Sequence, residues 1–293
     1  MDLMLGSKVL LGSLPHLDRL LKCLFNPLEE RLNRSHRSHT TLRNRAVLVQ
    51  ALLVPGSYFI GSFANHLATT PYIGPPIAVL VIARSIGLRQ QWDITRASLL
   101  EIPPHAGKLR HAGEQLIMSY SRDWICNLTL FVAGGFALLL PFRLLAAALD
   151  QHTASDSTRP SQPFKSAFVP FFNLLAIPGT MVSCFFLALA PVLVPGSSLS
   201  AVRGTIPAAT SDLRGILSRL IPLSIVAYAV GISFSCEGKD GTVRWIGPPD
   251  GRANIVVRDL RTIVLYFLAT SGLTLLAMAM LGISLILLQN GRY

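Results

Sequence analysis

The sequence has little charge and very few acidic residues for its length. Asp and Glu number 15 against 26 Lys and Arg, and charged residues make up 14% of the 293 residues, where soluble proteins carry about a quarter. Hydrophobic residues make up 51%, and the mean hydropathy is +0.49. This combination excludes a disordered or fibrous chain and argues against a soluble enzyme. It is typical of an integral membrane protein.

The sequence also lacks the common motifs of catalysis and metal binding. It contains no phosphate-binding P-loop, no dinucleotide-binding glycine motif, no zinc-protease helix motif and no serine nucleophile elbow. The seven histidines are scattered, and no carboxylate cluster accompanies them, so we expect no metal site. The four cysteines have no metal-ligand spacing, and we expect no disulfides. They are Cys23, Cys126, Cys184 and Cys236.

The net charge is +11, which in a soluble protein would suggest nucleic-acid binding. In a membrane protein the positive-inside rule explains it, because Lys and Arg concentrate in loops that stay on the cytoplasmic side. No aromatic-studded basic stripe or zinc-finger spacing supports a nucleic-acid partner. We therefore expect membrane lipid as a partner and no nucleic acid.

The first 45 residues are basic, and we expect no cleavable signal peptide among them. Leu17, Leu20, Leu21 and Leu24 recur at helical spacing, but no apolar run is long enough to cross a membrane. We predict that 1–45 is an amphipathic segment at the membrane interface. Its basic residues place the N-terminus in the cytoplasm.

The apolar runs predict an all-α, polytopic membrane protein with five to six transmembrane helices and amphipathic cytoplasmic helices, in the inner membrane. The expected spans cover 46–66, 70–87, 124–149, 167–195 and 262–289. The run 70–87 is broken by prolines and completes a helical hairpin over 46–87. The spans 124–149 and 167–195 form a pair within 124–195. The run 216–235 contains Arg219 and Pro222, and it could span, re-enter or pack in an irregular interior.

Polar and basic stretches separate these runs. Residues 88–122 predict two cytoplasmic helices, with a break at Pro103-Pro104. Residues 196–261 predict a cytoplasmic or re-entrant region that ends in a glycine-rich polar loop at 236–261. Arg143, near the end of the third expected span, is the one clear case of an ionisable group inside the membrane, and we expect its charged end to reach the interface. The scarcity of acidic residues in the spans argues against a proton-coupled transporter.

Short motifs in a fixed order suggest a family. Near the start they are Asp2-Leu-Met-Leu-Gly-Ser7, Pro15-His16 followed by Arg19, and Leu28-Glu-Glu-Arg-Leu-Asn-Arg34. Near the end they are Ala227-Tyr-Ala-Val-Gly-Ile232, Trp245-Ile-Gly247 and Arg258-Asp-Leu-Arg261. In this order along nearly the whole chain, the sequence resembles the CobD/CbiB family of cobalamin biosynthesis.

The resemblance implies a membrane-bound, ATP-dependent ligase that joins adenosylcobyric acid to an aminopropanol unit. ATP and Mg²⁺ are then cofactors only if the reaction is retained, and a corrinoid intermediate is a partner. The candidate catalytic residues are Asp2, Asp150 and Asp259. The candidate substrate- or phosphate-binding residues are Trp245, Gly247, Arg258 and Arg261, because basic groups beside a glycine-rich loop suit phosphate.

The sequence departs from the family where the chemistry should be. Ser7 replaces an acidic residue, and Phe171 and Phe172 stand where two aspartates belong. Mg²⁺ requires hard oxygen ligands, which phenylalanine cannot supply. Three hypotheses follow: an active ligase, a non-catalytic membrane partner or scaffold for a paralogue or a second copy, and a sensory membrane protein similar to AmpE.

Overall fold

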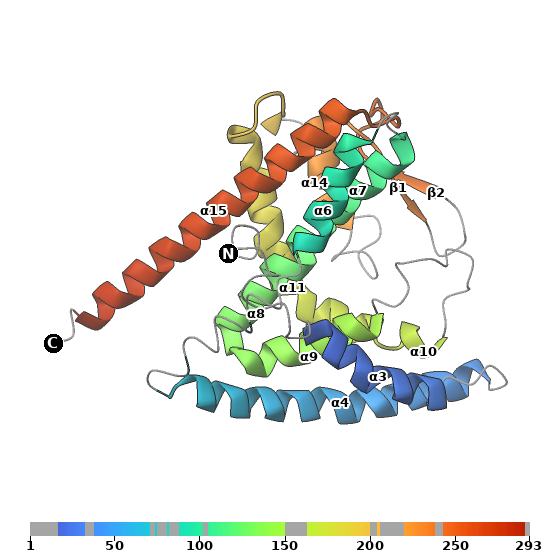
Figure 1. Ribbon diagram of the computed structural model, residues 1–293, viewed down its shortest axis with the longest axis vertical. Coiled ribbons are helices and arrows are strands. Elements are labelled where there is room, and N and C mark those ends of the chain that lie inside the picture. Colours follow the sequence, from blue (N-terminus) through green and yellow to red (C-terminus); the bar gives the residue numbers. More distant parts are fainter. Residues whose placement is uncertain are drawn as a thin grey trace. The chain divides into compact units, whose positions relative to one another are not determined.

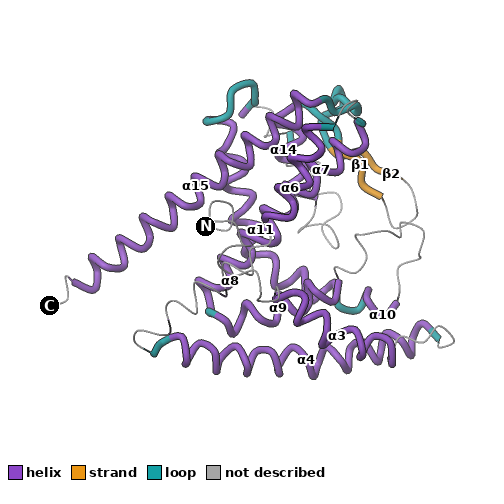
Figure 2. The backbone as a smooth tube through the Cα atoms, viewed as in Figure 1, coloured by secondary structure: helices purple, strands orange, loops and turns teal. Residues whose placement is uncertain are grey.

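The computed structural model is mostly helical, with one short β-hairpin (Figures 1 and 2). It describes residues 17–32, 38–70, 74, 81, 88–101, 105–149, 163–199, 204–205, 220–237 and 243–290. The all-α prediction is therefore confirmed in its main part. Asp2 and Asp150 lie outside the described residues, as does most of the span expected at 70–87.

The described residues fall into two compact units. Unit 1 comprises those between Met1 and Arg89 and between Arg122 and Thr180. Unit 2 comprises those from Gln90 to Ser121 and from Met181 onward. The chain passes between the units within three helices: α6 (Leu88–Leu100), the π-helix η1 (Tyr120–Cys126) and α11 (Val169–Leu189).

Unit 1 is built from helices that precede Thr180. They are α3 (Leu17–Leu32), α4 (His39–Ala68), the end of η1 (Tyr120–Cys126), α8 (Asn127–Gly134), α9 (Phe136–Leu149), α10 (Pro163–Ser166) and the first half of α11 (Val169–Leu189). The long helix α4 starts at the N-cap residue Ser38, whose hydroxyl accepts the Thr41 N–H. The helix α9 packs along α4.

Aromatic side chains form the core of unit 1. Phe25 of α3 packs edge-on against Phe168 at 5.7 Å between ring centroids, and Phe142 of α9 stacks on Phe172 of α11 at 5.1 Å. All four rings are buried. The basic N-terminal segment is thus not merely interfacial, because α3 contributes Phe25 to this core.

The run 124–149 is not one transmembrane helix, contrary to the prediction. Gly135 has φ +63°, a conformation that favours glycine, and it separates α8 from α9. The Asn65 side chain of α4 secures the break: its Oδ1 accepts the Phe136 N–H at 2.7 Å, and its Nδ2 donates to the Gly134 carbonyl at 3.1 Å. Asn65 thereby satisfies backbone groups that the break leaves free.

Unit 2 is built from α6 (Leu88–Leu100), α7 (Ala106–Ser119), the start of η1, the end of α11, the 3-10 helix η3 (Ala190–Val192), α14 (Leu220–Val230), the strands β1 (Phe234–Glu237) and β2 (Val243–Ile246), and α15 (Val257–Asn290). Two cytoplasmic helices were expected on either side of Pro103-Pro104. The helices α6 and α7 lie there, and their cytoplasmic position stays a prediction. The antiparallel pair β1–β2 was not expected, and it replaces the first part of the loop predicted at 236–261.

The helices of unit 2 are joined by aromatic contacts and buried hydroxyl groups. Phe267 of α15 contacts Trp92 and Tyr120 at 6.4 and 6.1 Å between centroids. The Tyr120 hydroxyl hydrogen-bonds Thr274 Oγ1 at 3.0 Å. Burial raises the pKa of Tyr120 to about 12.

Three helices among the described residues are long and apolar enough to cross a membrane. They are His39–Ala68, Phe164–Val192 and Val257–Ser284. They contain most of the spans predicted at 46–66, 167–195 and 262–289. The apolar helices α9 and α14 are shorter, about 21 and 17 Å at 1.5 Å per residue, against a hydrocarbon core of about 30 Å.

Gly61 allows α4 to approach α9 closely. A Cβ atom at this position would overlap the backbone of Phe136 and Ala137, whereas a Cβ at Gly56 of the same helix would meet nothing within 4 Å. We expect Gly61→Ala to lower the free energy of unfolding by about 1–3 kcal/mol. Gly56→Ala is the matched control and should be neutral or stabilising. Unfolding in detergent measures both; equal effects would contradict this packing.

Candidate functional site

The predicted site residues of unit 2 gather around the β-hairpin and the start of α15. A loop of residues 247–256 joins the two elements and runs beside the segment 231–233. The Ser233 N–H donates to the Arg252 carbonyl at 3.0 Å, and the Arg252 N–H donates to the Gly231 carbonyl at 3.2 Å. Trp245, Gly247 and Asp259 are therefore held in one connected region.

Asp259 starts the helix α15. Its Oδ2 accepts the N–H of Val256, the N-cap residue, at 3.1 Å, as an acid in the third helical position does in a capping box. Its Oδ1 accepts from the Arg252 guanidinium at 2.7 Å. The Asp259 side chain is 4% exposed. Both oxygens are engaged in structural contacts, which leaves Asp259 poorly suited to act as a catalytic base.

Gly247 has a packing role. Its φ is +151°, and a Cβ would overlap the Ile232 carbonyl and lie 3.0 Å from the Ser233 Cα. The space beside Gly247, where a phosphate was expected to contact the backbone, is therefore already filled by Ile232 and Ser233 of the chain itself. The family resemblance singled out Gly247 as a binding residue. The structure explains the glycine by packing, because the 247–256 loop contacts the segment 231–233 at this position.

Trp245 is held by an arginine that the sequence analysis did not single out. The guanidinium of Arg110, from α7, lies over the indole ring with its Cζ 4.9 Å from the centroid. The same group donates to Ser235 Oγ at 3.4 Å and to the Ala253 carbonyl. Arg110 thus links α7, β1, β2 and the 247–256 loop, while Trp245 remains 53% exposed.

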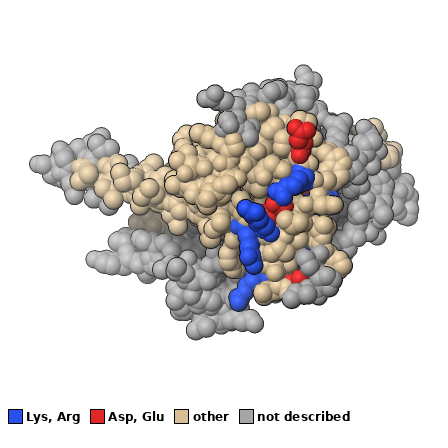
Figure 3. Space-filling model, turned by 90° about the horizontal axis from the view of Figure 1, so that it is seen from above, with Lys and Arg blue, Asp and Glu red and all other residues tan. Residues whose placement is uncertain are grey.

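Basic side chains form a row on the face of the structure seen in Figure 3. Arg258 and Arg261 are exposed on the first two turns of α15. The predicted phosphate-binding arginines are therefore accessible. Lys108 of α7 is instead paired: it donates to Glu101 at 2.5 Å, and this bond lowers the pKa of the Glu101 carboxyl.

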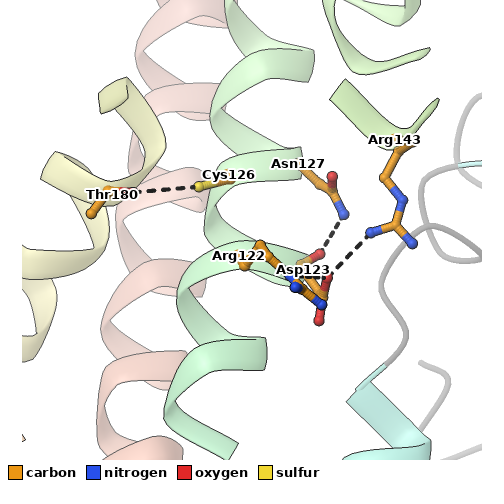
Figure 4. Close-up of polar contacts among 6 residues, drawn as sticks. All are labelled: Arg122, Asp123, Cys126, Asn127, Arg143 and Thr180. Atoms are coloured by element: carbon orange, nitrogen blue, oxygen red, sulfur yellow. Dashed lines mark hydrogen bonds and ion pairs between the residues drawn. The ribbon is translucent and has the colours of Figure 1, made fainter. Parts of the chain in front are cut away.

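Unit 1 contains a second polar centre, which the sequence analysis did not find (Figure 4). Asp123 of η1 pairs with Arg143 of α9 at 3.4 Å and with Arg122 at 3.3 Å. The Arg143 side chain is only 3% exposed, so the expectation that it reaches the interface is wrong. Asn127, also buried, donates to the Asp123 carbonyl at 2.5 Å.

The wide turns of a π-helix position Asp123. π-helices are rare and often occur at functional sites. η1 also brings Cys126 against α11, where its Sγ lies 3.9 Å from Thr180 Oγ1 (Figure 4). Arg143 is the only part of this centre that the sequence marked, because its partner Asp123 lies just before the expected span.

The structure shows no carboxylate cluster for a metal ion in the part of the chain that it describes. No group of three or more His, Cys, Asp or Glu side chains lies close enough there to hold a metal ion. The two phenylalanines at the expected aspartate positions belong to the aromatic core: Phe172 stacks on Phe142, and Phe171 packs beside it.

Comparisons of the chain with protein-family models, with curated proteins and with solved structures find no match.

If Asp259 has a structural role, Asp259→Ala should lower the free energy of unfolding by about 1–2 kcal/mol, because α15 loses its capping carboxylate and Arg252 loses its partner. Asp250→Ala, in the exposed turn of the same loop, is the matched control and should change stability by less than about 0.5 kcal/mol. Thermal unfolding in detergent measures both. An unchanged midpoint for Asp259→Ala would refute the structural role.

Removal of one member of the buried pair should be costly. We expect Asp123→Ala to destabilise the protein by about 3 kcal/mol, because Arg143 is left buried without this carboxylate. Asp123→Asn combined with Arg143→Met should recover part of the loss. Arg122→Gln, at a more exposed position, should cost less than about 1 kcal/mol. Unfolding midpoints of the four proteins test this order, and a double variant less stable than Asp123→Ala contradicts it.

Proposed function

We propose that the protein is a divergent CobD/CbiB-like membrane protein of cobalamin biosynthesis that no longer carries out the ligase reaction. In this proposal it serves as a membrane partner or scaffold for an intact synthase. The order of motifs from Asp2 to Arg261 supports the link to the family. The aromatic core at Phe171 and Phe172 supports the loss of chemistry.

The observation that carries the proposal is the stack of Phe172 on Phe142 in unit 1. By resemblance, two acidic residues would occupy positions 171 and 172. A carboxylate buried in this aromatic cluster would be costly without a partner, so the present core and an acidic metal site exclude each other. The chain has kept a helix where the resemblance predicts one, and has exchanged carboxylates for packing.

The contacts of Asp259 support the same conclusion. It is the one candidate catalytic acid among the described residues, and Arg252 and the start of α15 engage both of its oxygens. The proposal therefore assigns no ATP or Mg²⁺ requirement to this chain alone. A corrinoid intermediate would meet the intact partner.

We further propose that the protein lies in the inner membrane in several passes, with the N-terminus in the cytoplasm. The three long apolar helices account for three of these passes. The shorter helices α9 and α14 would lie at membrane depth within the protein, where broken helices are tolerated. The basic residues of 1–45 and of 252–261 support a cytoplasmic position for both segments.

Genetic complementation tests the loss of activity. The gene is expressed in a bacterium deleted for its own cobinamide-phosphate synthase, and growth is scored on cobyric acid under cobalamin-dependent conditions. We expect no growth, although cobinamide should restore it and the protein should be present in the membrane fraction. Growth on cobyric acid would show that the chain is itself a synthase.

The partner role has a separate test. The tagged chain is co-expressed with an active CobD/CbiB synthase and purified in mild detergent. We expect the synthase to co-elute with this chain and not with an unrelated membrane protein carrying the same tag. Failure to co-elute would overturn the partner role, whatever the outcome of complementation.

A further inference from the structure

Two arginines at the start of α15 have no partner within the described part of the chain. Arg258 and Arg261 are exposed and form no ion pair or side-chain hydrogen bond there. The neighbouring Arg252 is instead paired with Asp259. Within the described residues, the start of α15 therefore presents two positive charges with no ion-pair partner.

These arginines share one side of the helix. Residues three apart on an α-helix are neighbours, with Cβ atoms about 5–6 Å apart. The only acid between them, Asp259, is buried and cannot neutralise them, because its oxygens already accept from Arg252 and from the Val256 N–H. Two guanidinium groups at this spacing can bind one phosphate, since each presents a planar fork of donors.

Arg258 and Arg261 also lie immediately before the apolar part of α15. No charged residue occurs from Thr262 to Gly291, and the helix is exposed and apolar at Leu265 and Leu268. A hydrocarbon core of about 30 Å takes up about 20 helical residues. When α15 crosses a membrane, Arg258 and Arg261 therefore lie outside the hydrocarbon core, on its headgroup side.

Trp245 and Val256 extend the same end of unit 2. Trp245 is 53% exposed and Val256 is 48% exposed. Arg110 fixes the indole ring and also binds the Ala253 carbonyl, three residues before Val256. Tryptophan is enriched at the headgroup level of membrane proteins because its ring is apolar and its N–H is polar. An exposed indole beside an exposed valine suits this layer.

We propose that Arg258 and Arg261 form a binding site for the phosphate of an anionic phospholipid, with Trp245 and Val256 seated among the headgroups. The site depends on α15 crossing a membrane and not on the ligase or partner role. Charge complementarity favours an anionic lipid over a zwitterionic one, because the latter carries its own ammonium group. The attraction should weaken with salt, as expected for exposed charges.

The test measures lipid affinity of the purified full-length protein in a neutral detergent by native mass spectrometry. Phosphatidylglycerol and phosphatidylcholine of the same acyl chains are titrated separately. We expect the wild-type protein to bind phosphatidylglycerol more tightly. Each arginine near an anionic surface is worth about a fivefold change, so Arg258→Gln with Arg261→Gln should weaken phosphatidylglycerol binding about 25-fold.

Two further variants separate a built site from general charge. Arg258→Lys with Arg261→Lys keeps the charge but loses the forks, and we expect an affinity between those of the wild type and the glutamine variant. Arg96→Gln removes an exposed arginine from α6 of the same unit, and it should leave phosphatidylglycerol affinity unchanged. Each variant is first checked for an unchanged unfolding midpoint, which the exposed positions predict.

Three results would overturn the proposal. The first is equal affinity of the wild type for the two lipids. The second is full phosphatidylglycerol affinity in a folded glutamine double variant. The third is displacement of the lipid by millimolar inorganic phosphate, with loss of phosphate binding in the same variant, because this would assign the two arginines to a soluble phosphate.

Discussion

Polar groups that enter the apolar helices must find partners there, and this constraint shapes both units. Water cannot satisfy a buried hydrogen-bonding group in an apolar environment, and an unpaired one is costly. In unit 1, Asn65 supplies both the acceptor and the donor needed where α8 ends and α9 begins. In unit 2, Ser121 bonds Ser183 at 2.8 Å, and Tyr266 donates to the Leu187 carbonyl at 2.9 Å. These few bonds decide where helices break and how they meet.

Hydropathy predicted the long helices because each is a single uninterrupted apolar run. It could not predict the break at Gly135, since the run 124–149 stays apolar across the break and the compensating side chain, Asn65, lies in another helix. The β-hairpin was missed for a related reason: its two strands have four residues each, too few for an alternating pattern to stand out from a loop.

The candidate site stays a prediction. Motif order singled out Trp245, Gly247 and Asp259, and in the structure they lie on the hairpin, the 247–256 loop and α15. It could not reveal that Asp259 is committed to Arg252, or that Arg110 covers Trp245, because these partners come from contacts that no local spacing encodes. For Arg143 the sequence identified the unusual charge but not its partner, since Asp123 lies in a π-helix that sequence patterns do not mark.

The bond between Asn65 and the start of α9 has a consequence for the synthesis of the chain. The ribosome makes Asn65 71 residues before Phe136. The residue that satisfies the first N–H of α9 is thus already folded into α4, or already in the translocation machinery, when α9 emerges. The helix α9 begins with a free backbone donor that only α4 meets, so its stable entry into an apolar environment has to wait for α4. The order of the two helices along the gene is therefore also the order in which they can be built.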